Sequence, residues 1–256
     1  MKKCIAAVVM MLSVTLSGAA MAQSAFTIMT EELPPFNFEQ EGVVQGISAD
    51  VLMRLMDMVG NQIERSSIQI VPWARGYNKV LEEPGTVLFS MARTEQREPL
   101  FTWVGPITDL TLGLIAPKEK KILINSIEDA KGYRIGSIRD GAPEQLVIKA
   151  GIEESSLDRI SQPDLNIKKL QAGRIDMFAF NVPTTFYLMI QMGLDPNDYE
   201  VVYTLKEAQL YFAFHHDMDA AFIARMNTAL EELKQPDSTG KSEFDRIVET
   251  YLGKRP

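Results

Sequence analysis

Short apolar runs alternate with helical patterns along the first part of the chain, and this alternation constrains the fold most. Three runs predict strands, at residues 25–30, 68–71 and 86–91. The spacing of apolar residues predicts intervening helices at 49–59 and 72–83. Ser48 is the expected N-cap of the first helix. A strand–helix–strand–helix–strand order implies a parallel sheet, and therefore an α/β fold.

A second α/β unit begins near residues 107–112. The expected strands are 112–116, 133–138, 157–160 and 177–180, and the expected helices include 166–172 and 184–192. Two further strands, 201–204 and 210–214, precede the amphipathic helix 220–233 and a last helix, 243–252. The chain therefore divides into two α/β units of similar size.

The N-terminus has the pattern of a secretory signal peptide. Lys2 and Lys3 form a basic region, residues 5–16 are apolar, and small residues at 20 and 22 predict cleavage after Ala22. The alternative is an uncleaved anchor, but the apolar part is shorter than the roughly 20 residues of a membrane span. We expect a signal peptide at 1–22 and a periplasmic mature chain with no membrane insertion.

Charge and cysteine content argue against nucleic-acid binding and against thiol or disulfide chemistry. The formal charge is -8, and removal of Lys2 and Lys3 takes it to -10. Such a chain is unsuited to nucleic acid, whose binding depends on neutralising phosphates. The single cysteine, Cys4, lies inside the signal segment, so the mature chain has neither a disulfide nor thiol chemistry.

The segment 89–97 is the strongest candidate for ligand contact. A strand ends in Ser90, and Arg93 and Arg97 follow it. A guanidinium presents a planar fork of donors that fits a carboxylate. The alternative is that both arginines lie on the surface and pair with Glu95 and Glu98. In parallel α/β sheets ligands bind at the carboxyl ends of strands, which are residues 33–36, Trp73 and 90–97 here.

Several motifs in a fixed order resemble one family. They are Pro35-Phe36, Gly46-Ile47 with Asp50, Trp73, Ser90 to Arg97, Tyr133 to Gly136, Asp140-Gly141 and Gly173 to Asp176. Together they resemble the family-3 extracytoplasmic solute-binding proteins, the polar amino-acid type of ABC importer component. This resemblance covers nearly the whole mature chain.

The resemblance implies a type II periplasmic-binding-protein-like fold with two lobes joined by two crossing strands. Lobe 1 would comprise residues 24–108 and 209–256, and lobe 2 residues 109–208. The crossings would fall near 107–112 and 204–211. It also implies a small-molecule ligand, an inner-membrane ABC permease as partner, and closure of the lobes on the ligand. We expect a monomer without a cofactor.

The resemblance also implies site residues. Arg97 would bind the carboxylate of the ligand with help from Ser90. Ala92 stands where the family usually has Ser or Thr. Gly141 and Ala142 stand where it usually has Gly-Thr, which leaves only backbone donors. Asn181 stands where an aspartate usually binds the α-ammonium.

Asn181 in place of the usual aspartate changes the ligand that we expect, because a neutral amide gives no charge pairing with an ammonium. A carboxylate ligand without an α-ammonium therefore becomes an alternative to an amino acid. Glu32, or its neighbour Glu31, could instead supply the negative charge. Trp73 and Phe36 are candidates for an aromatic wall, with packing as the alternative.

Three functions fit this sequence. The first is periplasmic binding of a small polar carboxylate-bearing solute, an amino acid or a relative, for an ABC importer. The second is a dehydratase-like enzyme on the same scaffold, and the third is a ligand-sensing partner of a membrane receptor. We favour a non-enzyme. We expect no metal site at 215–217, because adjacent residues of an extended chain point to opposite faces.

Overall fold

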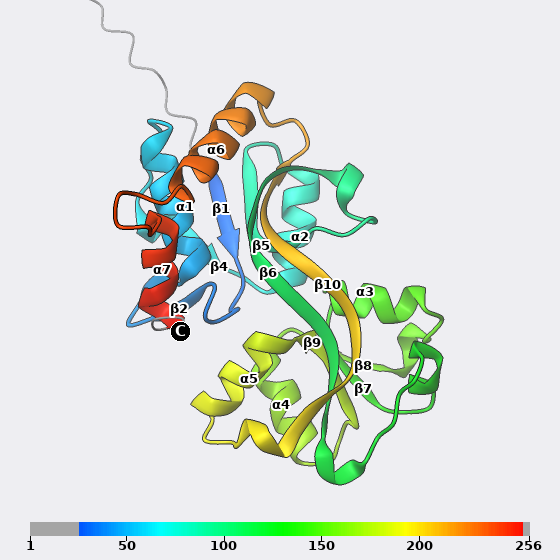
Figure 1. Cartoon of the computed structure of the whole chain (residues 1–256). Helices are drawn as coiled ribbons and strands as arrows, with labels where there is room; N and C mark the ends of the chain where they lie inside the picture. The colour runs from blue at the N-terminus through cyan, green and yellow to red at the C-terminus, as the bar shows by residue number, and fades with distance from the viewer. Residues whose placement is uncertain (1–25, 253–256) are drawn as a thin grey trace, which may run out of the picture.

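The computed structural model describes residues 26–252, so the predicted signal peptide lies outside the described part of the chain. Figure 1 shows two groups of helices and strands joined by two long strands that cross between them. These crossing strands are β6 (Phe101–Pro117) and β10 (Tyr199–His215). They pair antiparallel along their whole lengths, from Tyr199 opposite Pro117 to His215 opposite Phe101. The molecule is therefore a two-lobed α/β protein.

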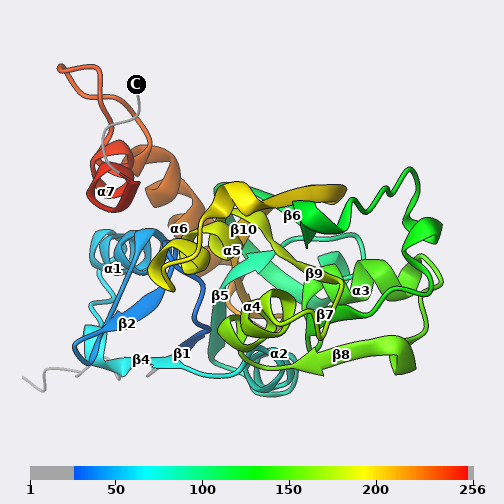
Figure 2. The same cartoon turned by 90° about the horizontal axis from the view of Figure 1, so that it is seen from below.

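The first lobe holds the elements from both ends of the chain. Its other strands are β1 (Thr27–Thr30), β2 (Phe38–Gln40), β3 (Val43–Gln45), β4 (Ile68–Ile70) and β5 (Thr86–Ala92). Its helices are α1 (Ile47–Met58), α2 (Trp73–Glu82), α6 (Ala220–Leu233) and α7 (Glu243–Leu252). Figure 2 shows α7 beside α1, where the Tyr251 hydroxyl donates to the Asp50 carboxylate at 2.6 Å. This contact ties the end of the described chain to the first helix.

The second lobe is built from the middle of the chain. Its strands are β7 (Ile135–Ile138), β8 (Leu157–Ile160) and β9 (Met177–Asn181), and its helices are α3 (Ala142–Lys149), α4 (Pro163–Gln171) and α5 (Val182–Gln191). Short 3-10 turns lie at 65–67, 98–100, 118–120, 127–130, 154–156 and 196–198. The residue boundaries of the lobes stay a prediction, because β6 and β10 run through both lobes as single strands.

One mixed sheet of eight strands runs through both lobes, in the order β4-β1-β5-β10-β6-β9-β7-β8. Within the first lobe β1 pairs parallel with β4 and β5, and within the second β7 pairs parallel with β8 and β9. The parallel α/β units predicted from the alternation of strands and helices are therefore present. The antiparallel pairs β10–β5 and β6–β9 attach the crossing strands to each lobe.

Three local predictions were wrong. Ser48 does not cap α1: it is buried inside the helix, and Gly46 occupies the N-cap position. Gly46 has a φ of 119°, and a Cβ there would lie 2.5 Å from the carbonyl oxygen of Phe36. The expected strands 201–204 and 210–214 form one strand, β10, because its exposed middle residues pair with β6 between the lobes. The hairpin β2–β3 was not predicted as strands.

Membrane insertion finds no support in the described part of the chain. No helix there is both long enough and apolar enough to cross a bilayer.

Candidate functional site

A small pocket lies between the two lobes, where several parallel strands end. It is lined by Glu31, Leu33, Trp73, Ser90, Ala92, Arg97, Leu110, Leu112, Ile138, Gly141, Ala142, Pro143, Asn181 and Leu210. These residues lie on or just past the carboxyl ends of β1, β5, β7 and β9, on the first turns of α2 and α3, and on both crossing strands. This is the position expected for a ligand site in an α/β sheet. The volume is about 40 Å³, which is room for about three water molecules.

Arg97 is the charged anchor of the pocket. Its side chain is buried, with 1% of the residue exposed. The guanidinium lies 5.0 Å from the ring of Trp73 and 5.1 Å from the ring of Tyr77. One terminal nitrogen donates to the carbonyl of Ala92 at 3.3 Å and the other to the carbonyl of Asp140 at 3.0 Å. Its Nε is buried and has no hydrogen-bond partner among residues 26–252.

The two arginines of this segment have different environments. Arg93 forms a two-pronged ion pair with Glu98, both contacts 2.5 Å long, and lies 5.1 Å from the ring of Tyr211. The alternative that both arginines lie on the surface and pair with glutamates therefore holds for Arg93 and fails for Arg97. Burial lowers the pKa of the Arg97 guanidinium to about 10, against the raising effects of Tyr77 and Glu31. Arg97 is still charged at neutral pH.

A β-bulge directs Ser90. Phe89 pairs with Phe212 and Met91 pairs with Tyr211, so Ser90 is the extra residue on β5. Its φ is 60°, a left-handed conformation that is uncommon outside glycine. Bulges of this kind change the direction of a side chain at a site. The Ser90 hydroxyl donates to the Oδ1 of Asn37 and lines the pocket.

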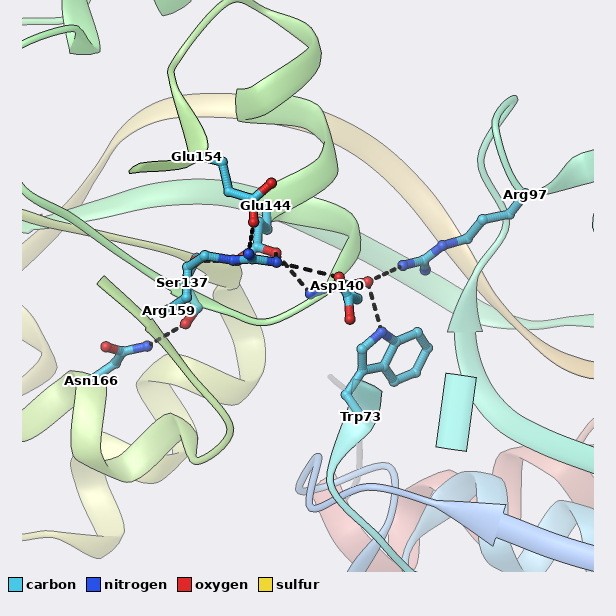
Figure 3. Close-up of polar contacts among 8 residues, drawn as sticks. All are labelled: Trp73, Arg97, Ser137, Asp140, Glu144, Glu154, Arg159 and Asn166. Atoms are coloured by element: carbon cyan, nitrogen blue, oxygen red, sulfur yellow. Dashed lines mark hydrogen bonds and ion pairs between the residues drawn. The ribbon is translucent and has the colours of Figure 1, made fainter. Parts of the chain in front are cut away.

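The backbone carbonyl of Asp140 connects the lobes. It accepts the indole N–H of Trp73 at 2.8 Å and an N–H of Arg97 at 3.0 Å (Figure 3). Asp140 also has a left-handed backbone, with a φ of 58°. Both donors belong to the first lobe and the acceptor belongs to the second. This contact between the lobes uses one terminal N–H of Arg97.

Buried charges hold the Asp140 loop in place. Glu144, 1% exposed, accepts the backbone N–H of Asp140 at 2.8 Å and pairs with Arg159 at 2.7 Å. The Ser137 hydroxyl donates to the second carboxylate oxygen of Glu144. Arg159 also contacts the carboxylates of Asp140 and Glu154 (Figure 3). No motif in the sequence indicated this network, since it joins residues from two strands, a loop and a helix.

Asn181 ends β9 and is the N-cap of α5. Its Oδ1 accepts the backbone N–H of Thr184 at 3.1 Å. Its carbonyl accepts the hydroxyl of Thr185 at 2.8 Å. The amide Nδ2 is buried and has no hydrogen-bond partner in the described part of the chain. Asn181 lines the pocket, and its Nδ2 is the amide group that the helix cap leaves without a partner among residues 26–252.

Only one of the two candidate glutamates lines the pocket. Glu31 lines the pocket, whereas Glu32 lies outside it and accepts the backbone N–H of Glu39 at 3.0 Å. Alternate residues point to opposite sides near a strand end, and the sequence did not decide which one faces inward. Burial raises the pKa of Glu31 from 4.5 to about 8, although Arg97 acts in the opposite direction. The Glu31 carboxyl is mostly protonated at neutral pH.

Phe36 also lies outside the pocket. It is buried in the core of the first lobe, and its carbonyl accepts the backbone N–H of Ser48 at 2.8 Å. Phe36 therefore packs in this core, the alternative that the sequence left open, and its part in an aromatic wall stays a prediction. Trp73 alone of the two aromatic candidates lines the pocket.

Seven of the nine residues expected in the site line the pocket together. They are Arg97, Ser90, Ala92, Trp73, Gly141, Ala142 and Asn181. The apolar wall comprises Leu33, Leu110, Leu112, Ile138, Pro143 and Leu210, and of these only Leu33 lies in a segment, 33–36, that the sequence pointed to as a ligand site. Leu33 and Ile138 stand where predicted strands end, which was an available signal. Leu110, Leu112 and Leu210 belong to the crossing strands, whose facing sides cannot be read from composition.

The expectation that residues 215–217 point to opposite faces of an extended chain was wrong. Strand β10 ends at His215 and the chain turns, so His215, His216 and Asp217 place one ligand atom each within 4.8 Å of one another. The Nδ1 of His215 accepts the backbone N–H of Asp217 at 3.2 Å, so one ring nitrogen is already used. These residues are remote from the pocket lining, and we assign them no metal.

Comparison with known structures identifies the class of protein that this fold defines. A histidine kinase sensor domain with similarity to periplasmic binding proteins superposes with a TM-score of 0.74 at 20% identity, covering 89% of this chain and 96% of that one. A mutant of ArgBP from T. maritima superposes with a TM-score of 0.73 at 19% identity, covering 90% of this chain and 95% of that one. The substrate binding protein of an amino acid ABC transporter superposes with a TM-score of 0.72 at 17% identity, covering 90% of this chain and 100% of that one. The fold is therefore that of the type II periplasmic binding proteins.

The family follows from the sequence match. Residues 26–254 match the bacterial extracellular solute-binding proteins, family 3, and the chain belongs to that family. The resemblance inferred from the motifs is thereby confirmed. A search of curated proteins found no match.

Proposed function

We propose that this protein binds a small carboxylate-bearing solute between its lobes in the periplasm and delivers it to an ABC permease. The family and the fold support binding of a solute, and the similarity to a binding protein of an amino acid ABC transporter supports the transport role. The single observation that carries the ligand chemistry is the burial of Arg97 in the inter-lobe pocket with its Nε unpaired among residues 26–252. A buried guanidinium with a spare donor favours a carboxylate oxygen.

Substitution of Arg97 tests this proposal. We expect Arg97→Ala to weaken binding by about 2–5 kcal/mol, the cost of truncating one partner of a buried charged pair. Arg93→Ala is the matched control, because Arg93 lies in the same segment and pairs with Glu98 outside the pocket. Isothermal calorimetry against a panel of amino acids, 2-oxo acids and other small organic acids measures both variants. Equal affinity of Arg97→Ala and wild type would remove Arg97 from the site.

Mass spectrometry of material released by denaturing the purified protein gives a second, independent test. A small carboxylic acid among the released molecules supports the proposal. Failure of the whole panel to bind, together with release of a ligand that lacks a carboxylate, would contradict it.

A sensing role is a second candidate, favoured by the superposition with a histidine kinase sensor domain. The binding chemistry would be the same, and the partner would be a membrane receptor instead of a permease. Cross-linking of the ligand-bound protein in cells, followed by identification of the membrane partner, distinguishes the two.

The enzymatic alternative receives less support. Arg97 and Glu31 are the only titratable side chains among the residues that line the pocket, and Glu31 is the one that could act as an acid near neutral pH. The structural relatives are binding proteins or a sensor domain. Incubation of prephenate with the pure protein tests it, and formation of a decarboxylated or dehydrated product would establish an enzyme.

A further inference from the structure

Two residues that line the pocket, one from each lobe, each carry a buried donor without a partner among the described residues. The donors are the Nε of Arg97 and the Nδ2 of Asn181, on residues that are 1% and 3% exposed. Leaving a buried donor without an acceptor is unfavourable. A ligand that bridges the lobes would therefore need oxygen acceptors toward both residues.

The helix cap fixes which end of the Asn181 amide is available. Only its Oδ1 can accept the backbone N–H of Thr184, so this bond, 3.1 Å long, turns the oxygen toward α5. The Nδ2 is the amide atom that has no partner in the described part of the chain. An ammonium group carries donors only, so next to Nδ2 it would place a donor against a donor. A carbonyl or hydroxyl oxygen of the ligand would satisfy Nδ2.

The rest of the pocket agrees with a ligand that has no cation. Glu31 is the single acidic side chain in the lining, and it lies close enough to Arg97 for the two charges to interact. Burial keeps the Glu31 carboxyl protonated at neutral pH, so it also offers an O–H donor. Most of the remaining lining is apolar, and Leu33, Leu110, Leu112, Ile138 and Leu210 contribute to it.

We propose that the ligand is a 2-oxo or 2-hydroxy carboxylic acid with an apolar side chain, and that Asn181 selects it over the corresponding α-amino acid. This inference rests on the proposed carboxylate-binding function. The carboxylate would bind Arg97, and the oxygen on C2 would accept the N–H of Asn181. The apolar residues would surround the side chain.

Three ligands that differ only at C2 test the inference. They are 4-methyl-2-oxopentanoate, leucine and 4-methylpentanoate, with carbonyl, ammonium and no substituent at C2. Calorimetry on the wild type should show the 2-oxo acid bound about tenfold or more tightly than the other two, the factor that one hydrogen bond supplies. The analogous set built on phenylpyruvate, phenylalanine and 3-phenylpropanoate covers a larger side chain.

Asn181→Asp is the decisive variant. Aspartate caps a helix as well as asparagine, so α5 should be retained. Its second carboxylate oxygen replaces the donor by a charged acceptor, and the preference should change by about tenfold or more in favour of leucine over the 2-oxo acid. Asn197→Asp, an exposed position on the same lobe, is the control for the added charge. Circular dichroism spectra and thermal unfolding of both variants report whether the fold is retained.

The outcomes separate this inference from the proposed function. Tighter wild-type binding of leucine or phenylalanine than of the 2-oxo acids would overturn the inference and leave carboxylate binding intact. Equal binding of 4-methylpentanoate and 4-methyl-2-oxopentanoate, or an unchanged preference in Asn181→Asp, would also overturn it. Failure of every carboxylate to bind, with no effect of Arg97→Ala on any ligand found, would overturn both.

Discussion

At the scale of single residues, burial in the pocket shifts the pKa values of two ionisable groups in the direction that favours their neutral forms. Burial lowers the pKa of Arg97 to about 10 and raises that of Glu31 to about 8, since both neutral forms are favoured in a water-poor site. At neutral pH the arginine keeps its charge and the glutamate loses most of its own. The pocket is therefore positive, although the whole chain has a formal charge of -8.

The raised pKa of Glu31 predicts how stability depends on pH. The folded state holds the Glu31 proton more tightly than the unfolded state, whose carboxyl titrates near 4.5. Unfolding therefore releases a proton between about pH 4.5 and 8, and the free energy of unfolding falls as pH rises through this window. The full loss is on the order of 5 kcal/mol at high pH.

Glu31→Gln should remove this dependence. Urea denaturation of wild type and variant at pH 5, 6.5 and 8 measures it. The stability of wild type relative to the variant should be greatest at pH 5 and decline toward pH 8. Parallel stability curves for the two proteins would show that Glu31 does not titrate in this range.

At the scale of elements, α3 and the loop before it form one unit around a buried carboxylate. Glu144 connects the backbone of Asp140, the hydroxyl of Ser137 and the guanidinium of Arg159. Through Asp140 this unit sets the position of the carbonyl that Trp73 and Arg97 contact. A change in a residue that does not line the pocket should therefore alter the pocket.

Glu144→Gln tests this element. We expect a loss of about 3 kcal/mol in the free energy of unfolding, at the low end for a broken buried ion pair, because Arg159 keeps Asp140 and Glu154 as partners. Asp164→Asn is the control, since its pair with Lys168 on α4 is exposed and should matter by less than about 1 kcal/mol. Urea titration measures both. Equal losses in the two variants would show that the Glu144 network carries no special stability.

At the scale of the whole molecule, the Asp140 carbonyl and an exposed ion pair between Lys149 and Glu95 at 3.6 Å both join the two lobes. The small volume of the pocket, about 40 Å³, means that a bound solute requires the lobes to move apart or the loop to yield. The Asp140 carbonyl accepts one terminal N–H of Arg97, and the Nε of Arg97 stays without a partner among residues 26–252. The closed arrangement of the lobes in the ligand-free protein therefore opposes binding. A variant with weaker contacts between the lobes should bind its ligand faster.

Trp73→Phe should shift the free protein toward an open form. It removes the 2.8 Å bond from the indole N–H to Asp140 and keeps an aromatic ring, so the ratio of open to closed molecules should rise about threefold to tenfold. Small-angle X-ray scattering without ligand should give a larger radius of gyration. Trp103→Phe is the matched control, because its indole donates to Glu98 within the first lobe at 3.2 Å. An equal response of both variants would refute the inter-lobe role of Trp73.

The sequence by itself determined the local elements and their class. The helices α6 and α7 have the bounds that their apolar spacing predicted, and the strand–helix alternation gave the parallel units of both lobes. It also placed Arg97 at the pocket, because residues after strand ends lie at one edge of a parallel sheet, and the family resemblance pointed to Asn181, which lines the same pocket. These features depend on neighbours along the chain, so a sequence pattern is enough to predict them.

Only the tertiary structure decided which atoms meet. It placed Glu31 rather than Glu32 in the pocket lining, separated Arg97 from the paired Arg93, and left the Nδ2 of Asn181 without a partner in the described part of the chain. These choices depend on one bulge, one helix cap and one contact between lobes, each of which joins residues distant in sequence or turns a side chain. The direction of a hydrogen-bonding atom follows from packing in three dimensions, and a linear pattern does not contain it.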